Sequence, residues 1–392
     1  MPASETPRNL TSNRALTLAA YAAFVPIGIV TVLLGPLLPT LSARWSLSYS
    51  AAGALFPTQF WASTVAVGAS GILVSRYGFR FAMKAGLMLA TVSVALLLTG
   101  SHLLGMICVA GYGVGLGLAV PAANLLVAEV NPERRSAALN TLNFCWSVGA
   151  VACPFLVAAA AKGGRIPLML GLVAGFLLVV AVGIAAMPSS IVEPTASADA
   201  RVTAIDWKQR ALPVLGAMFF IYVGTENSFG GWVASYAKSL GNLTATVAVM
   251  TPSFFYGSLT LGRWVAPLLL RAIDEIRLAQ AGVLLACAGM AGLLWSYSLP
   301  GIIVSACLAG LGLSSVYPIT ISLLSREFGP AASRVGSVMF TLANLGGGFL
   351  PWLVGASSSQ LGSLRLGMTV PAIGSAALFV LYLRDWKPER VN

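Results

Sequence analysis

One acidic residue of this sequence lies far from any polar segment. Glu226 is about 15 residues into the apolar run 211–238, which is roughly 22 Å along a helix at 1.5 Å per residue. A carboxyl group buried so deeply in apolar surroundings is costly to ionise and marks function by default. Glu226 is therefore a candidate for exchanging a proton or binding a substrate. The alternative is a structural role, in which it is hydrogen-bonded to a neighbouring helix.

A second set of polar side chains, amides and aromatic rings, is spread over the apolar runs. Amides form paired hydrogen bonds with hydroxyl groups, and flat rings cover the apolar face of a sugar. The candidates for binding a neutral polyol are Gln59, Asn124, Asn143, Trp146, Asn227, Tyr256, Tyr317 and Asn344. For each amide the alternative is a hydrogen bond to another helix. Trp232 and Tyr236 fit better as aromatic residues of the outer membrane interface.

No basic residue of the sequence is as central as Glu226. Arg263 is the nearest and lies in the inner half of the run 244–270. We expect it to act in gating, or to contact an acid near the cytoplasmic end of the fourth or tenth run. Anionic substrates need a buried cation to offset their desolvation. An acid without a central base therefore suits a neutral polyol or a cation.

Twelve apolar runs carry these residues. The chain has 392 residues, of which 57% are hydrophobic and 9% charged, whereas a soluble domain has about 25% charged residues. The runs are long enough for spanning helices, which need roughly 20 residues, and they are continuous, which excludes a β-barrel. We predict an all-α membrane protein with spans at 15–41, 49–75, 80–100, 104–130, 136–161, 166–187, 211–238, 244–270, 276–298, 301–325, 333–360 and 364–384.

The order of small-residue motifs indicates two related halves. The Gly-Leu-Gly-Leu motif at 115–118 recurs at 310–313, 195 residues later, and Gly149 matches Gly346, 197 residues later. Halves with the same sense imply parallel repeats about an axis along the membrane normal. We expect two pseudo-symmetric six-helix bundles and a polar cytoplasmic linker, at 1–187, 211–392 and 188–210. Prolines are expected to kink three of the helices, at Pro121, Pro318 and Pro351.

Lysine and arginine are unevenly distributed over the loops. If both termini are cytoplasmic, 18 of the 23 Lys and Arg residues fall on the inner side. This asymmetry predicts an inner-membrane protein with cytoplasmic N and C termini. It also accounts for the net charge of +11 without a nucleic-acid partner.

The loop between the second and third runs carries a known motif. Gly71, Arg76, Gly78 and Arg80 fit the pattern G-x-x-x-D-R-x-G-x-R, with Ser75 in place of the acid. This pattern resembles the signature loop of the major facilitator superfamily. The resemblance covers the whole chain and implies twelve helices, alternating access and a gating role for the loop.

Further stretches resemble the fucose permease branch of proton-coupled sugar symporters. These are Ala122-Ala123-Asn124, Leu139-Asn140, Gly149-Ala150, Tyr222 to Glu226, and Asn344 to Gly348. Asn143 falls where that branch carries a Gln. Val120 and Gly35 stand where the branch carries its proton-linked acids. The resemblance implies sugar symport, but these departures move the expected coupling to Glu226.

We predict a secondary active transporter that carries a small neutral polar solute, such as a monosaccharide, by symport with a proton. Sodium is the alternative coupling ion. The alternative function is proton-driven efflux of hydrophobic or cationic compounds. The sequence has one His and no cluster of residues typical of an enzyme site. We expect a monomer in the lipid bilayer, with no cofactor and no metal.

Overall fold

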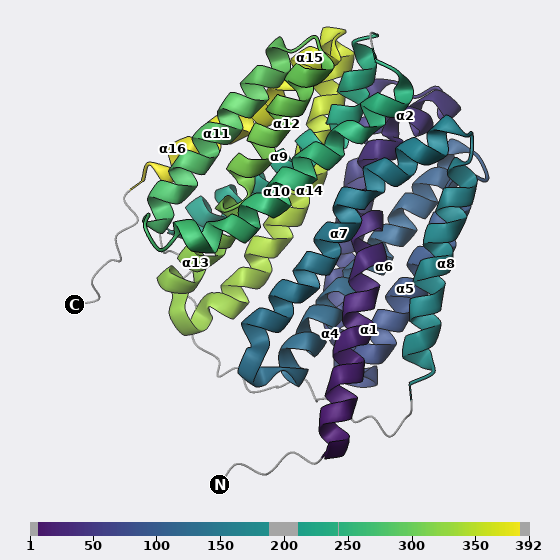
Figure 1. Ribbon diagram of the computed structural model, residues 1–392, viewed down its shortest axis with the longest axis vertical. Helices are drawn as coiled ribbons and strands as arrows, with labels where there is room; N and C mark the ends of the chain where they lie inside the picture. The colour runs from purple at the N-terminus through teal and green to yellow at the C-terminus, as the bar shows by residue number, and fades with distance from the viewer. Residues whose placement is uncertain (1–6, 188–210, 242, 385–392) are drawn as a thin grey trace. The chain divides into compact units, whose positions relative to one another are not determined.

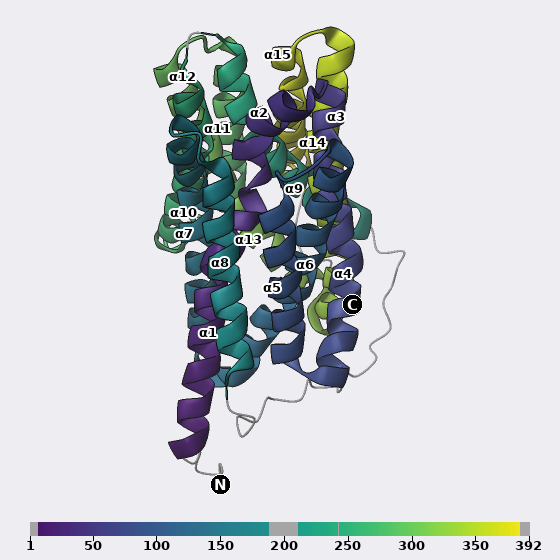
Figure 2. The ribbon, with the colours of Figure 1, turned by 90° about the vertical axis from the view of Figure 1, so that its right-hand side faces the viewer.

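Helices joined by short turns make up the described chain (Figures 1 and 2). The computed structural model describes residues 7–187, 211–241 and 243–384, and no strand occurs in these ranges. The all-α class predicted from composition is thereby confirmed. The predicted linker 188–210 lies outside the described residues.

The chain divides into two compact units, and each is described by itself. Unit 1 contains Met1–Leu33 and Trp61–Ala200, and unit 2 contains Leu34–Phe60 and Arg201–Asn392. The helices of unit 1 are α1 (Pro7–Val32), most of α4 (Leu55–Tyr77), α5 (Phe79–Leu96), α6 (His102–Val130), η1 (Pro132–Arg134), α7 (Arg135–Lys162) and α8 (Ile166–Ala185). Those of unit 2 are α2 (Leu34–Trp45), α3 (Tyr49–Gly53), α9 (Ala211–Ser239), α10 (Ala245–Leu269), α11 (Glu275–Trp295), α12 (Leu299–Leu313), α13 (Val316–Phe328), η2 (Gly329–Ala331), α14 (Ala332–Leu361), α15 (Leu364–Gly367) and α16 (Thr369–Tyr382).

Nine helical segments of the described residues are long and apolar enough to cross a membrane. Three more helices, α4, α9 and α10, have 23, 29 and 25 residues. They exceed the roughly 20 residues that a span needs but are more polar than the nine. Together the two groups correspond to the twelve predicted runs. The polar residues Glu226 and Arg263 lie in two of the three less apolar helices.

The tenth predicted run is two helices rather than one. α12 ends at Leu313 and α13 begins at Val316, so the last carbonyl groups of α12 need partners from outside the helix. Tyr222 of α9 donates its hydroxyl hydrogen to the carbonyl of Leu313 at 3.2 Å. Pro318 stands in the first turn of α13, where its missing N–H leaves no hydrogen bond unmade. The interruption lies just before Pro318, where a kink was predicted, and Pro121 and Pro351 lie inside α6 and α14.

The same close contact between two helices occurs once in each unit. In unit 1, a Cβ atom on Gly149 of α7 would overlap the carbonyl oxygen of Val25 in α1. In unit 2, a Cβ atom on Gly346 of α14 would overlap the carbonyl oxygen of Phe220 in α9. These are the two glycines that the sequence repeat pairs. Only glycine allows the helix backbones to approach so closely.

Residues 34–60 pack within unit 2, against α9 and α14. A Cβ atom on Gly35 of α2 would lie 2.7 Å from the carbonyl oxygen of Gly230. The main-chain N–H of Ser50 donates to Oγ of Ser359 at 2.8 Å. This early segment of the chain is therefore fixed to helices that come more than 150 residues later in the sequence.

Two aromatic residues of α9 are buried donors. Trp232 is 1% exposed and donates from Nε1 to the carbonyl of Pro351 at 2.8 Å. Tyr236 is also buried and donates to the carbonyl of Leu293 at 3.0 Å. The prediction that they belong to the membrane interface is wrong, because both rings pack inside unit 2.

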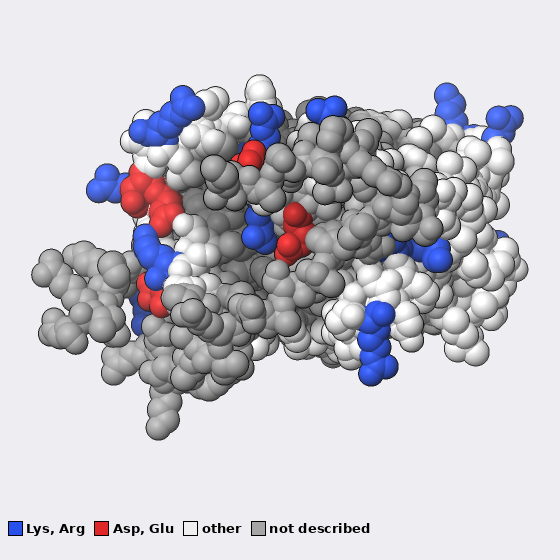
Figure 3. Space-filling model, turned by 90° about the horizontal axis from the view of Figure 1, so that it is seen from below, with Lys and Arg blue, Asp and Glu red and all other residues white. Residues whose placement is uncertain are grey.

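Lys and Arg side chains are spread more widely than Asp and Glu side chains in the view of Figure 3. The predicted orientation of the two termini in a membrane stays a prediction.

Candidate functional site

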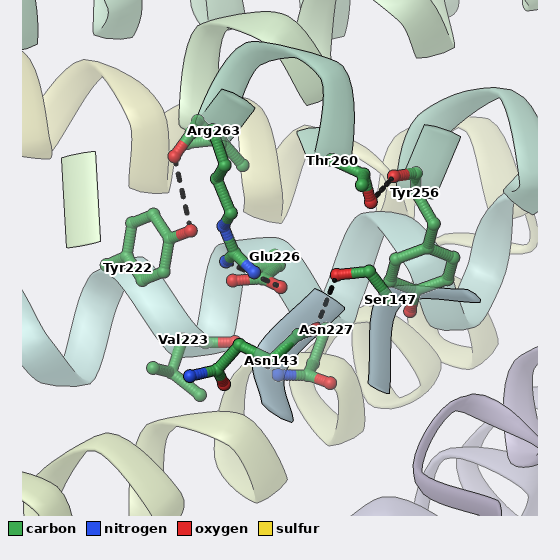
Figure 4. A network of polar contacts seen from close by, with 10 residues as sticks. Asn143, Ser147, Tyr222, Val223, Glu226, Asn227, Tyr256, Thr260 and Arg263 are labelled. Atoms are coloured by element: carbon green, nitrogen blue, oxygen red, sulfur yellow. Dashed lines mark hydrogen bonds and ion pairs between the residues drawn. The ribbon is translucent and has the colours of Figure 1, made fainter. Parts of the chain in front are cut away.

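Glu226 of α9 and Arg263 of α10 face each other within unit 2 (Figure 4). Arg263 Nη2 lies 4.0 Å from Glu226 Oε1, and the two side chains are 30% and 13% exposed. The expectation that Arg263 contacts an acid of the fourth or tenth run is wrong. A basic group does accompany the deep carboxyl group, so the pair carries no net charge when both groups are ionised.

The packing of α10 places Arg263. The preceding residue, Gly262, lies against Ser314, and a Cβ atom on Gly262 would overlap its Oγ. Because α10 approaches the junction of α12 and α13 so closely, Arg263 is held beside the interrupted helix. Its Nε is buried and has no hydrogen-bond partner within the described residues. The guanidinium therefore keeps an unused donor next to Glu226.

Two tyrosines border the ion pair. The side chain of Tyr222 lies beside Glu226 and Arg263, within electrostatic range of both (Figure 4), and its hydroxyl donates to the carbonyl of Leu313. The ring of Tyr222 stacks on that of Tyr317, with centroids 5.3 Å apart and planes at 29°. Tyr317 was a predicted binding residue, but Tyr222 was not. Its spacing of four residues from Glu226 places it on the same helix face and could have identified it.

Three predicted amides share one arrangement. In each, Nδ2 donates to the carbonyl four residues earlier in the same helix; the pairs are Asn227 to Val223 at 2.8 Å, Asn124 to Val120 at 2.9 Å, and Asn143 to Leu139 at 2.9 Å. None of the three makes a hydrogen bond to another helix within the described residues. Asn227 lies beside Glu226 in unit 2, whereas Asn124 and Asn143 belong to unit 1. The amide oxygens remain available to a ligand.

The other predicted binding residues divide into buried and accessible ones. Trp146 donates to Oγ1 of Thr31 at 3.3 Å and so links α7 to α1. Gln59 and Tyr256 are 3% and 5% exposed, and Tyr256 packs against Gly230. Asn344 of α14 is half-buried. Within unit 2, Asn344, Asn227 and Tyr317 are thus the more accessible of the predicted residues, and Asn227 directly follows Glu226 in α9.

The predicted gating loop has defined contacts in unit 1. Gly78 precedes α5 with φ of 84°, a conformation that side chains with a Cβ rarely adopt. Arg80 donates from Nη2 to the carbonyls of Ile184 and Met187, at 3.2 and 2.6 Å, and thereby caps the C-terminus of α8. Ser75, which replaces the acid of the motif, donates to the carbonyl of Ile72 in its own helix. Gly71 and Arg76 are exposed.

These helices and this loop define a polytopic membrane transporter. The Major Facilitator Superfamily matches residues 20–351, and the chain belongs to this family. The resemblance inferred from the signature loop is thereby confirmed. Members of the family and the relatives described below are transporters, which agrees with the prediction that the chain is not an enzyme.

Two curated relatives match almost the whole chain. A glucose/galactose transporter of Brucella abortus is 26% identical over 370 residues, covering 88% of this chain and 88% of the relative. The glucose/mannose transporter GlcP of Bacillus subtilis is 24% identical over 365 residues, covering 88% and 89%.

Two solved structures share the fold. A D-xylose-proton symporter has a TM-score of 0.76 at 16% identity and covers 95% of this chain and 99% of that one. The Escherichia coli fucose:proton symporter FucP has a TM-score of 0.64 at 18% identity, covering 94% and 97%. The predicted resemblance to the fucose permease branch is in keeping with these neighbours. The likeness establishes the fold of this chain.

Proposed function

We propose that this protein is a secondary active transporter that carries a small neutral polar solute of the monosaccharide type by symport with a proton. The observation that carries the proposal is the Glu226–Arg263 pair, with Tyr222, Tyr317 and Asn227 around it. The two relatives named as sugar transporters, each matched over most of its length, support the choice of solute.

The neutrality of the pair favours a neutral solute. Because Arg263 compensates Glu226, an uncharged sugar adds no charge to be neutralised. A cationic compound would meet the arginine as well as the acid, which removes the main reason for proposing cation efflux. Hydroxyl groups of a sugar could bind the Asn227 amide, and a ring face could lie on Tyr317.

Proton coupling would act through the distance between the two charges. At 4.0 Å the pair is loose, longer than a charge-assisted hydrogen bond of about 2.8 Å. Protonation of a Glu226 oxygen would remove the attraction and free the Arg263 guanidinium to change partners. Loss of the proton on the other side of the membrane would restore the pair. A carboxyl group that exchanges its partner in this way can link proton movement to a conformational change.

The proposal includes the predicted membrane arrangement. The two six-helix bundles, 1–187 and 211–392, would rock about a central site, with 188–210 as the linker between them. The protein would be a monomer of the inner membrane with both termini in the cytoplasm. Sodium remains the alternative coupling ion.

Uptake into proteoliposomes tests the proposal. Radiolabelled D-glucose, D-galactose and L-fucose are offered with and without an inward proton gradient, and with a sodium gradient in a separate arm. We expect the proton gradient to drive sugar accumulation in wild type. In Glu226→Gln it should fail to do so, while exchange of internal for external sugar continues. Glu129→Gln, which changes a half-buried acid of α6 in unit 1, is the matched control and should behave as wild type. Accumulation unchanged in Glu226→Gln would contradict the coupling role.

The unused Nε donor of Arg263 favours a second candidate function, transport of an organic anion. A substrate carboxylate could bind Arg263 when Glu226 is protonated, because the guanidinium then lacks its counter-ion. Adding benzoate and lactate to the substrate panel separates the two candidates. Uptake of an anion, with none of any sugar, would replace the first proposal by the second.

A further inference from the structure

A pocket of about 200 Å³ lies in unit 1 where α4, α5 and α8 have their ends together. It is lined by Tyr77, Arg80, Phe81, Lys84, Ile184 and Ala185. It is made only of residues of unit 1 and contains none of the predicted sugar-binding residues. Its two cations and two aromatic rings make it a candidate site for a separate ligand.

Two positive charges are held at this pocket. Arg80 and Lys84 are one turn apart on α5, so both side chains project from the same helix face. The hydrogen bonds from Arg80 to the carbonyls of Ile184 and Met187 fix its guanidinium at the end of α8. Nζ of Lys84 lies 5.6 Å from the centroid of the Phe81 ring, and within the described residues Lys84 has no acidic partner. The pocket therefore presents the Lys84 ammonium group, without an acidic partner in this part of the chain, to an anion.

An apolar wall continues from the pocket along two neighbouring helices. On α5 the next exposed residues on this side are Met88 and Val92, and on α8 they are Val182 and Val179, with exposures between 37% and 69%. α5 and α8 pack side by side, as both ribbon views show (Figures 1 and 2). These exposed apolar residues are typical of a surface that faces lipid chains. The pocket thus forms the charged end of a lipid-facing surface.

The aromatic residues of the pocket fit the same location. Tyr77 is 60% exposed and Phe81 is 38% exposed, and their rings pack with centroids 5.0 Å apart. Exposed aromatic rings at the end of a spanning helix are characteristic of the headgroup region of a bilayer. An amphipathic ligand bound here would have its polar end next to the cations and aromatic rings. Its apolar part would lie along the aliphatic side chains.

We propose that this pocket binds an anionic phospholipid, with the phosphate group at Lys84 and the acyl chains along α5 and α8. Charge complementarity favours an anionic lipid, because Lys84 has no acidic partner within the described residues, and a zwitterionic headgroup would place a second cation beside it. Basic pockets at helix ends are a known means of lipid recognition. The inference does not depend on which solute the protein carries.

Native mass spectrometry of the full chain in detergent tests the proposal. Phosphatidylglycerol and phosphatidylcholine with identical acyl chains are titrated separately, and inorganic phosphate is added in a third arm. We expect phosphatidylglycerol to bind more tightly, and Lys84→Met to weaken its binding about fivefold, which is the usual effect of one cation near an anionic surface. Lys162→Met, which removes an exposed lysine at the end of α7, is the matched control and should keep the wild-type affinity.

Three outcomes would overturn the proposal. Equal affinities for the two lipids would show that the charge of the headgroup does not affect binding. Equal weakening by Lys84→Met and Lys162→Met would indicate general surface electrostatics rather than a site. Displacement of the lipid by inorganic phosphate at similar concentration would assign the pocket to a soluble anion. Lys84→Arg keeps the charge and should retain binding, which distinguishes loss of the cation from misfolding.

Discussion

The hydroxyl group of Tyr222 donates to the main-chain carbonyl of Leu313, 91 residues later, at 3.2 Å. This bond satisfies the end of α12 at the point where the helix stops. The same hydroxyl lies beside Glu226 and Arg263, within range of both charges (Figure 4). We therefore expect a change in the charge of the pair to affect the junction of α12 and α13.

Replacing Tyr222 with Phe should impair both stability and transport. The carbonyl of Leu313 would lose its donor, and an unsatisfied buried carbonyl costs about 1–3 kcal/mol. Thermal unfolding in detergent and sugar uptake in proteoliposomes measure the two effects. Tyr21→Phe is the matched control, because Tyr21 makes the same kind of bond to the carbonyl of Ala138 in unit 1. Tyr21→Phe should lower stability and leave uptake intact. Normal uptake by Tyr222→Phe would show that the hydrogen bond at the junction of α12 and α13 is not needed for transport.

Removing Arg263 alone should destabilise the protein more than removing both charges. Arg263→Met leaves Glu226 with no counter-ion, whereas the double variant Glu226→Gln/Arg263→Met leaves no charge in the site. The loss in Arg263→Met should stay below the about 3–5 kcal/mol of a fully buried pair, because the Arg263 side chain is 30% exposed. Unfolding midpoints of the two single variants and the double variant complete a double-mutant cycle. Strictly additive losses would mean that the two groups do not interact.

Alanine at Gly346 should reduce the yield of folded protein. Its Cβ would overlap the carbonyl oxygen of Phe220, so α9 and α14 would have to separate, and such overpacking costs about 1–3 kcal/mol. Gly149→Ala should have a similar effect in unit 1. Gly175→Ala is the control, since nothing lies within 4 Å of a Cβ there. Size-exclusion profiles and unfolding midpoints should rank the control above both; equal behaviour of all three would refute the close contact.

A disulfide between residues 50 and 359 should stop transport. The hydrogen bond from Ser50 to Ser359 brings α3 and α14 close together, although residues 34–60 continue along α4 into the other unit. If this segment moves away from unit 2 during the cycle, Ser50→Cys/Ser359→Cys should lose uptake on oxidation and regain it on reduction. The two single variants control for the five native cysteines, which are all free. Full uptake by the cross-linked protein would show that the contact persists throughout the cycle.

The membrane helices were the most predictable part of the fold, because long apolar runs have few alternatives to spanning a bilayer. The pairing of Gly149 with Gly346 was also visible in the sequence, since close helix packing requires glycine at equivalent positions. In the tenth run only a kink at Pro318 was predicted, not the interruption of the helix between Leu313 and Val316. The signal for this interruption was the pair Ser314 and Ser315 ahead of Pro318. It was easy to miss because the surrounding residues are apolar.

The partner of Arg263 was harder to predict than its depth. Residue counts along a run place a side chain along the helix axis only approximately, since helices tilt. They also do not determine which neighbour the side chain faces. Counting placed Glu226 about 15 residues into its run and Arg263 in the inner half of its own run, yet the two groups lie 4.0 Å apart. Such a contact depends on how α9 and α10 are rotated against each other, and one sequence contains little information on that.

Three side-chain amides are held in one orientation by a hydrogen bond from Nδ2 to a carbonyl of their own helix. They belong to Asn124, Asn143 and Asn227. If the group turned over, its oxygen would point at a carbonyl oxygen, and two acceptors would repel each other. The oxygen and the second N–H hydrogen of each amide therefore point in fixed directions. If these amides bind the sugar as proposed, they should distinguish epimers by the direction of a hydroxyl group rather than by the number of hydroxyl groups.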